Sequence, residues 1–118
     1  MARGKLADRV RAYYDRIDAE DYEAVFDLFA DDVTYHRPGQ EPIEGIDDLR
    51  TFYLEERPLS DGEHEVREVV VDGDTATVRG RFTGEQAGET VAFGFADVHR
   101  FEDGVIVERH TYTDRDTV

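Results

Sequence analysis

Hydrophobic and polar residues alternate along the last third of the chain, a pattern typical of β-strands. Residues 91–101 and 105–112 carry β-branched and aromatic side chains with a period of two. Asp103 and Gly104 between them are a strong hairpin signal. Because strand side chains alternate between two faces, one face of the first arm is expected to carry Phe93, Phe95, Asp97 and His99.

The first half of the chain shows helical spacing of apolar residues. Positions three or four apart predict a helix over residues 5–18. Asp21 is a suitable N-cap for a second helix, whose apolar stripe would consist of Tyr22, Val25, Phe26 and Phe29. A short strand is expected at 33–36 and a loop rich in proline and glycine at 37–42. A third helix is expected at 45–57, where a proline follows.

The remaining residues up to the hairpin are predicted to form strands. Strands at 63–71 and 75–83 flank an Asp-Gly-Asp turn, and residues 84–88 connect the second of them to the hairpin. Three helices followed by an antiparallel meander predict one α+β domain covering residues 1–118. Helices on one face of a curved sheet would enclose the core, and a pocket is expected there.

Charge narrows the range of partners. Twenty-nine acidic residues oppose fourteen basic ones, which gives a net charge of −15. Nucleic acids and anionic membranes are therefore not expected as partners, because both attract basic proteins. The acids are dispersed and Lys5 is the only lysine, which favours a salt-adapted surface of halophilic type over ordinary acidity. The N-terminus is charged rather than apolar, so a cytoplasmic location is expected.

Asp97 is the first candidate for chemistry, because it shares a strand face with phenylalanines. An unpaired buried charge is costly, so this carboxylate either finds donors or takes up a proton. One interpretation is a pocket acid that donates a hydrogen bond to a carbonyl oxygen. The alternative is a structural ion pair with Arg79, Arg81 or Arg109.

Other candidates surround the expected pocket. Tyr35 and Arg37 should share a face at the end of the short strand, and Arg37 would favour an anionic or polar substrate. Alternatively, Arg37 pairs with a nearby glutamate. His99 could relay a proton or be a satisfied sheet histidine, and Phe95 and Phe52 are expected to contact the ligand. Four scattered histidines indicate no metal, and the absence of a glycine-rich phosphate loop indicates no nucleotide cofactor.

Three sequence features resemble the nuclear transport factor 2-like superfamily, and within it the SnoaL-like and ketosteroid isomerase-like branch. They are Phe29-Ala30-Asp31-Asp32-Val33, Gly45 at a helix start, and Phe101-Glu102-Asp103-Gly104-Val105-Ile106. The resemblance covers nearly the whole chain. It implies a cone-shaped domain with three N-terminal helices on a curved, mostly antiparallel sheet. It also implies a conical pocket and a homodimer formed through the sheet.

The resemblance also suggests roles for individual residues. Ketosteroid isomerases combine a helix-one tyrosine with a protonated late-strand aspartate as an oxyanion hole, and a second aspartate acts as the base. By position, Tyr13 matches the tyrosine and Asp97 the protonated aspartate. Arg37 stands where the base is expected, and an arginine cannot act as a base, so the usual isomerase route is not expected.

Two interpretations of function stay open. The first is a cofactor-free enzyme with isomerase- or cyclase-like chemistry on Asp97 and Tyr13, acting on a small polar or carbonyl-containing molecule. The second is a non-catalytic ligand-binding or dimeric interaction module. An open pocket in front of Asp97 would favour the first, and an arginine fully engaged with Asp97 would favour the second.

Overall fold

The computed structural model describes residues 2–57 and 59–114. The chain begins with two helices and a strand: α1 (Ala2–Asp18), α2 (Tyr22–Phe26) and β1 (Phe29–His36). Next come β2 (Ile43–Glu44), α3 (Ile46–Thr51) and a π-helical turn, η1 (Phe52–Glu56). Four long strands complete it: β3 (Leu59–Asp72), β4 (Thr75–Gln86), β5 (Glu89–Glu102) and β6 (Val105–Thr113).

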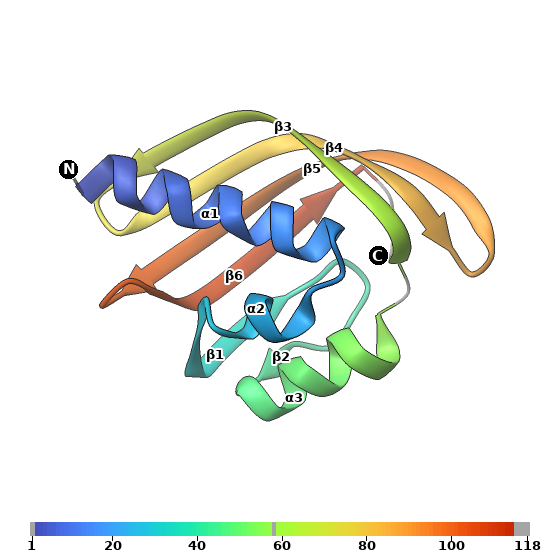
Figure 1. Cartoon of the computed structure of the whole chain (residues 1–118), viewed down its shortest axis with the longest axis horizontal. Coiled ribbons are helices and arrows are strands. Elements are labelled where there is room, and N and C mark those ends of the chain that lie inside the picture. The colour runs from blue at the N-terminus through green and yellow to red at the C-terminus, as the bar shows by residue number, and fades with distance from the viewer. Residues whose placement is uncertain (1, 58, 115–118) are drawn as a thin grey trace.

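The six strands form one curved sheet in the order β2-β1-β6-β5-β4-β3. Only β1 and β6 run parallel, and the other neighbours are antiparallel. Helices α1, α2 and α3 all lie on one face of this sheet (Figure 1). The predicted α+β architecture, with helices on a curved and mostly antiparallel sheet, is therefore confirmed.

Several element boundaries differ from the sequence prediction, and two of the differences have a clear physical reason. Phe29 was expected on a helical stripe but begins β1, because it pairs with Ile106 of β6 and the Leu28 carbonyl accepts from the Ile106 amide. The connection at 84–88 shrinks to a two-residue turn. Ala87 and Gly88 both adopt positive φ, 53° and 82°, the backbone that a tight hairpin requires.

Alternation along β5 places its inward residues in the core, as predicted: Val91, Phe93, Phe95, Asp97, His99 and Phe101 are all buried. Aromatic side chains of α1 and η1 face them, including Tyr13, Tyr14 and Tyr53. The apolar layer between helices and sheet thus contains two polar side chains of one strand, which is unusual enough to define a site.

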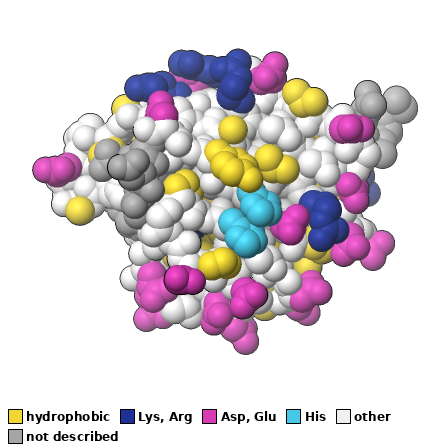
Figure 2. Space-filling model, turned by 180° about the vertical axis from the view of Figure 1, so that it is seen from behind, with side chains coloured by type: hydrophobic (Ala, Val, Ile, Leu, Met, Phe, Trp, Pro, Cys, Tyr) yellow, Lys and Arg dark blue, Asp and Glu magenta, His cyan; other side chains and the backbone are white. Residues whose placement is uncertain are grey.

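The opposite face of the sheet carries a stack of rings. His36 of β1 and His110 of β6 lie with centroids 4.3 Å apart and planes 9° apart, and Tyr112 stacks on His110. Figure 2 shows two histidines in contact beside hydrophobic side chains on this face, with acidic side chains mainly toward its margins. Tyr112 is 58% exposed.

Candidate functional site

A small cavity lies on the inner face of the sheet, against α1. Its volume is about 30 Å³, which accommodates only a few non-hydrogen atoms. Among the described residues, its wall combines aromatic and apolar groups with three arginines and one carboxylate: Tyr13, Tyr35, Arg37, Arg57, Leu59, His64, Phe93, Phe95, Asp97, Arg109 and Thr111. The cavity is therefore cationic, although the net charge of the chain is −15.

Asp97 is buried and accepts hydrogen bonds on both carboxylate oxygens. Arg109 Nη2 donates to Oδ2 over 2.8 Å in a buried ion pair. Tyr14 donates to the same oxygen over 2.5 Å, and Thr111 donates to Oδ1 over 2.6 Å. Burial alone would raise the pKa of Asp97, but Arg109, together with His99 and these hydrogen bonds, lowers it below its usual value. Asp97 is thus a carboxylate at neutral pH.

Arg109 uses its three nitrogen atoms differently. Nε donates to His99 Nε2 over 3.1 Å, and Nη2 binds Asp97. The guanidinium carbon lies 4.3 Å from the Tyr13 ring centroid and 4.6 Å from the Tyr35 centroid, so two aromatic faces enclose the cation. Nη1 is buried and has no hydrogen-bond partner among the described residues. Such a donor is costly, and it marks a position where a ligand could supply an acceptor atom.

His99 lies behind Arg109 and does not line the cavity. The ring is fully buried, its Nδ1 lies 3.2 Å from the Ala76 carbonyl oxygen, and its Nε2 accepts from Arg109. Burial and the neighbouring Arg109 lower the pKa of His99 to about 4, so the ring is neutral at pH 7. The predicted contact of His99 with a ligand stays a prediction; in the structure this side chain orients Arg109 from outside the cavity lining.

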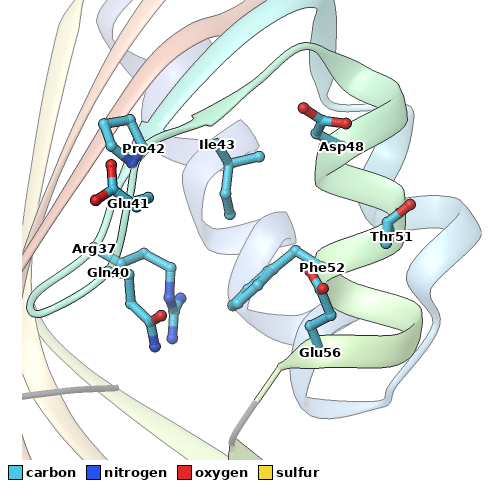
Figure 3. A pocket seen from close by; sticks show the side chains of 9 residues that line it. All are labelled: Arg37, Gln40, Glu41, Pro42, Ile43, Asp48, Thr51, Phe52 and Glu56. Carbon is cyan, nitrogen blue, oxygen red and sulfur yellow. The ribbon is translucent and has the colours of Figure 1, made fainter.

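Arg37 separates the cavity from a larger outer pocket. This outer pocket has a volume of about 420 Å³ and opens between the loop after β1 and the helical segment α3–η1 (Figure 3). Arg37 Nη1 donates to Tyr35 Oη over 2.7 Å, and its guanidinium lies 4.5 Å from the Phe52 ring centroid. Arg37 lines both spaces, whereas Phe52 lines only the outer one.

The tyrosine that binds Asp97 is Tyr14, not Tyr13. Tyr13 lines the cavity, but its hydroxyl oxygen lies 2.5 Å from that of Tyr53. The Tyr13 and Tyr14 rings meet edge to face with centroids 5.0 Å apart, and both are buried. The resemblance implied that Tyr13 and Asp97 donate to one ligand oxygen, and this role stays a prediction. In the structure the Tyr13 hydroxyl contacts Tyr53, while Arg109 favours the ionised form of Asp97.

The cavity brings together five of the seven predicted site residues: Tyr13, Tyr35, Arg37, Phe95 and Asp97. Sequence reasoning missed Arg57, His64 and Thr111, and considered Arg109 only as an ion-pair partner. An unbroken hairpin around Asp103 and Gly104 would pair Asp97 with His110. An extra residue on β6 shifts the register, so that Asp97 lies opposite Thr111 and His99 opposite Arg109.

Two further properties limit the chemistry of the described residues. Across residues 2–57 and 59–114, no three histidine or acidic side chains lie close enough together to hold a metal ion. Within the same ranges, no helix combines the length and the apolar character needed to cross a membrane.

Comparison with known families assigns the fold. The profile of the SnoaL-like domain matches residues 10–109, a stretch that includes Asp97, Arg109 and all six strands in whole or in part. The chain belongs to the SnoaL-like domain family. No curated protein sequence matches this SnoaL-like domain.

Solved structures resemble the SnoaL-like domain over almost its whole length. An NTF2-like protein of unknown function from Burkholderia pseudomallei is 21% identical, with a TM-score of 0.85, and 93% of this chain covers 91% of that one. An LEH-like epoxide hydrolase from M. tuberculosis is 20% identical with a TM-score of 0.85, at coverages of 97% and 86%. A candidate SnoaL-like polyketide cyclase from Jannaschia sp. CCS1 is 20% identical with a TM-score of 0.82, at coverages of 95% and 87%. At these identities the likeness shows a common fold.

Proposed function

We propose that this SnoaL-like domain binds a small organic ligand through a carboxylate or carbonyl oxygen that accepts a hydrogen bond from Arg109. The observation that carries the proposal is the buried Nη1 atom of Arg109, a residue that lines the cavity, because this atom has no partner among the described residues. Arg57 Nε, on the same wall, is likewise buried without a partner there. An oxygen atom between them would satisfy donors that are otherwise costly to bury.

The charge of the wall favours an anion. Three arginines face one carboxylate, Asp97, so a bound carboxylate would reduce an excess of buried positive charge. The cavity of about 30 Å³ admits only the oxygen-bearing end of a ligand. The remainder would extend past Arg37 into the outer pocket of about 420 Å³, whose size is typical of small-molecule sites.

Within this proposal Asp97 holds Arg109 in place and does not donate a proton. An ionised carboxylate that already accepts from Arg109, Tyr14 and Thr111 is a poor acid. This arrangement favours the ligand-binding interpretation over isomerase- or cyclase-like acid chemistry on Asp97.

Titration with acetate tests the proposal, and acetamide of the same shape without charge is the control ligand. We expect saturable chemical-shift changes at the backbone amides of Asp97, Arg109 and Thr111 with acetate, at a dissociation constant of about 1 mM, equivalent to roughly −4 kcal/mol. Acetamide should bind more weakly, because it cannot offset the positive charge of the wall.

A matched pair of variants locates the site. The double variant Arg109→Met with Asp97→Asn removes both charges of the buried pair and should lose acetate binding. The Arg79 side chain on β4 is 60% exposed. Arg79→Gln removes this exposed positive charge and should bind acetate as the wild type does. Acetate binding that survives in the double variant, or the absence of saturable binding in the wild type, would contradict the proposed function.

We also infer a homodimer formed through the outer sheet face. The stack of His36, His110 and Tyr112 presents aromatic rings on a face whose acidic side chains lie mainly toward the margins, so a second copy meets least repulsion there. Light scattering should report twice the monomer mass, and Tyr112→Glu should shift it toward the monomer. A monomeric wild type at all concentrations would refute the dimer.

A further inference from the structure

His64 forms a close pair with the end of α1. Its Nδ1 lies 2.6 Å from Asp18 Oδ1, and its backbone amide donates to Asp18 Oδ2 over 2.8 Å. Both oxygens of one carboxylate are thus engaged by a single residue of β3. With the Nδ1 proton directed at Asp18, the neutral ring has its lone pair on Nε2. Asp18 therefore fixes both the orientation and the tautomer of His64.

The His64 ring lies in the wall of the cationic cavity. Its side chain is 10% exposed and packs against the rings of Tyr14, Phe82 and Phe95, with centroids 4.8 to 5.3 Å away. None of the described contacts engages Nε2 in a hydrogen bond. The same cavity wall carries Arg109 and Arg57, each with a buried nitrogen that has no described partner.

The residues that line this cavity thus supply one acceptor nitrogen and two donors without a described partner, the kinds of group that proton abstraction next to a carbonyl group requires. The donors stabilise negative charge that develops on oxygen, and the acceptor removes the proton from carbon. The other charged residues that line the cavity are Asp97, which is paired with Arg109, and Arg37, which also lines the outer pocket.

We propose that His64, oriented by Asp18, is a general base that removes a proton from the carbon beside the oxygen-bearing group held by Arg109. The C–H bond breaks, the proton moves to His64 Nε2, and the electron pair forms an enolate whose oxygen accepts from Arg109 Nη1. The imidazolium then exchanges its Nε2 proton with solvent water, and return of a solvent proton to the same carbon completes a hydrogen exchange. Return of a proton to a conjugated carbon instead completes an isomerisation. The proposal rests on the proposed function, since the ligand must bind Arg109.

His64 would be the catalytic residue and Asp18 a positioning residue. The chemistry thereby moves from Asp97, which is saturated by hydrogen bonds, to a histidine whose second nitrogen is available. A substrate of this class carries a carboxylate or carbonyl group with an acidic hydrogen on the adjacent carbon, and its body extends into the outer pocket.

Exchange of the methyl protons of pyruvate in deuterated buffer tests the step, because pyruvate is small and its methyl group is acidic beside a keto oxygen that Arg109 can hold. We expect the wild type to accelerate exchange, and His64→Gln to lower the saturated rate by about 100-fold, the size of a general-base contribution. Asp18→Asn should lower the saturated rate about tenfold with little change in the half-saturating pyruvate concentration, as loss of a supporting carboxylate does. His110→Gln, on the outer sheet face, is the control.

Acetate titration of the same variants distinguishes the two proposals. Suppose that acetate binds at Arg109 in the wild type, but that the wild type and His64→Gln exchange the methyl protons of pyruvate at the same rate. The role of His64 as a general base is then refuted, and the proposed function stands. If acetate does not bind at all, both proposals fall.

A second measurement needs no substitution. The chain contains no cysteine, so bromoacetate reports mainly on histidines. Nucleophilic attack by His64 Nε2 on the bromoacetate carbon forms an N–C bond and releases bromide. We expect His64 to be carboxymethylated faster than His36 and the more exposed His110. Acetate should protect His64, and neutral bromoacetamide should show no such preference. Modification of His64 no faster than that of His36 would overturn the proposal.

Discussion

Several of the interactions of the site meet in one side chain, that of Arg109. Its guanidinium is buried between two tyrosine rings, bonded to His99 and Asp97, and left with one free donor. Burial opposes its charge, but Asp97 raises the pKa of Arg109 well above its usual range. Because each charge of the pair is tolerated only through the other, the pair behaves as a unit.

Substitution of Asp97 by Asn is expected to destabilise the fold strongly. The Arg109 charge would stay buried without a counter-ion, and breaking a buried pair in this way costs about 3–5 kcal/mol. Urea unfolding measures the loss of free energy of unfolding. Addition of Arg109→Met should recover a large part of it, because the second charge is then removed as well. A double variant no more stable than Asp97→Asn alone would show that the pair is not coupled.

His99 predicts a specific pH dependence of stability. Its pKa is about 4 in the folded chain and about 6.5 when unfolded, so the unfolded state binds more protons between these values. The free energy of unfolding should therefore fall as pH drops from 6.5 to 4, by up to about 3 kcal/mol. The slope should flatten in His99→Gln and persist in His110→Gln. If the free energy of unfolding depended on pH equally in the wild type and in His99→Gln, the pH dependence would come from other residues.

At the scale of elements, the register of β5 against β6 assembles the polar cluster. The pairs Asp97 with Thr111 and His99 with Arg109 face each other directly across the two strands. The extra residue on β6 lets both Ile106 and Arg109 point inward, although they are three positions apart. Without this bulge, alternation would direct Arg109 and Ile106 to opposite faces.

The centre of the sheet also depends on a close approach at Gly80 of β4. A Cβ atom at Gly80 would collide with the Glu65 carbonyl oxygen and the Phe95 ring. One at Gly94 would approach the end of the Asp114 side chain and would meet the Gly80 carbonyl oxygen at an ordinary contact distance. Gly80→Ala is therefore expected to destabilise the domain by about 1–3 kcal/mol. Gly94→Ala should change stability by less than about 0.5 kcal/mol. If Gly80→Ala and Gly94→Ala lowered the melting temperature equally, the close approach at Gly80 would not limit the packing of the sheet.

At the scale of the whole molecule, charge is divided between surface and interior. The chain carries fifteen more acidic than basic residues, yet three arginines gather around one internal cavity. The surrounding negative potential would oppose the entry of an anion at low ionic strength. Salt screens this repulsion at the surface but acts weakly on the buried Arg109 contact.

Salt should therefore stabilise the fold. Self-repulsion at a net charge of −15 is screened as the Debye length falls from about 10 Å at 0.1 M to about 3 Å at 1 M. We expect the melting temperature to rise over this range and then to level off, while sucrose at equal osmolality gives no such levelling. A melting temperature independent of sodium chloride would argue against a salt-adapted surface.

Local patterns in the sequence determined the α+β class, the C-terminal hairpin and the shared face of Phe93, Phe95, Asp97 and His99. These features follow from periodicities of two and of three to four residues, and from turn residues that few other positions tolerate. Net charge likewise follows from composition alone.

Only the tertiary structure decided what meets Asp97. Two adjacent tyrosines of α1 are both buried, so periodicity could not choose between Tyr13 and Tyr14. The bulge on β6 changed which residues face inward, and the Asp18–His64 pair joins residues forty-six positions apart. Contacts of this kind arise from register and packing between distant elements, which the spacing within a single element does not encode.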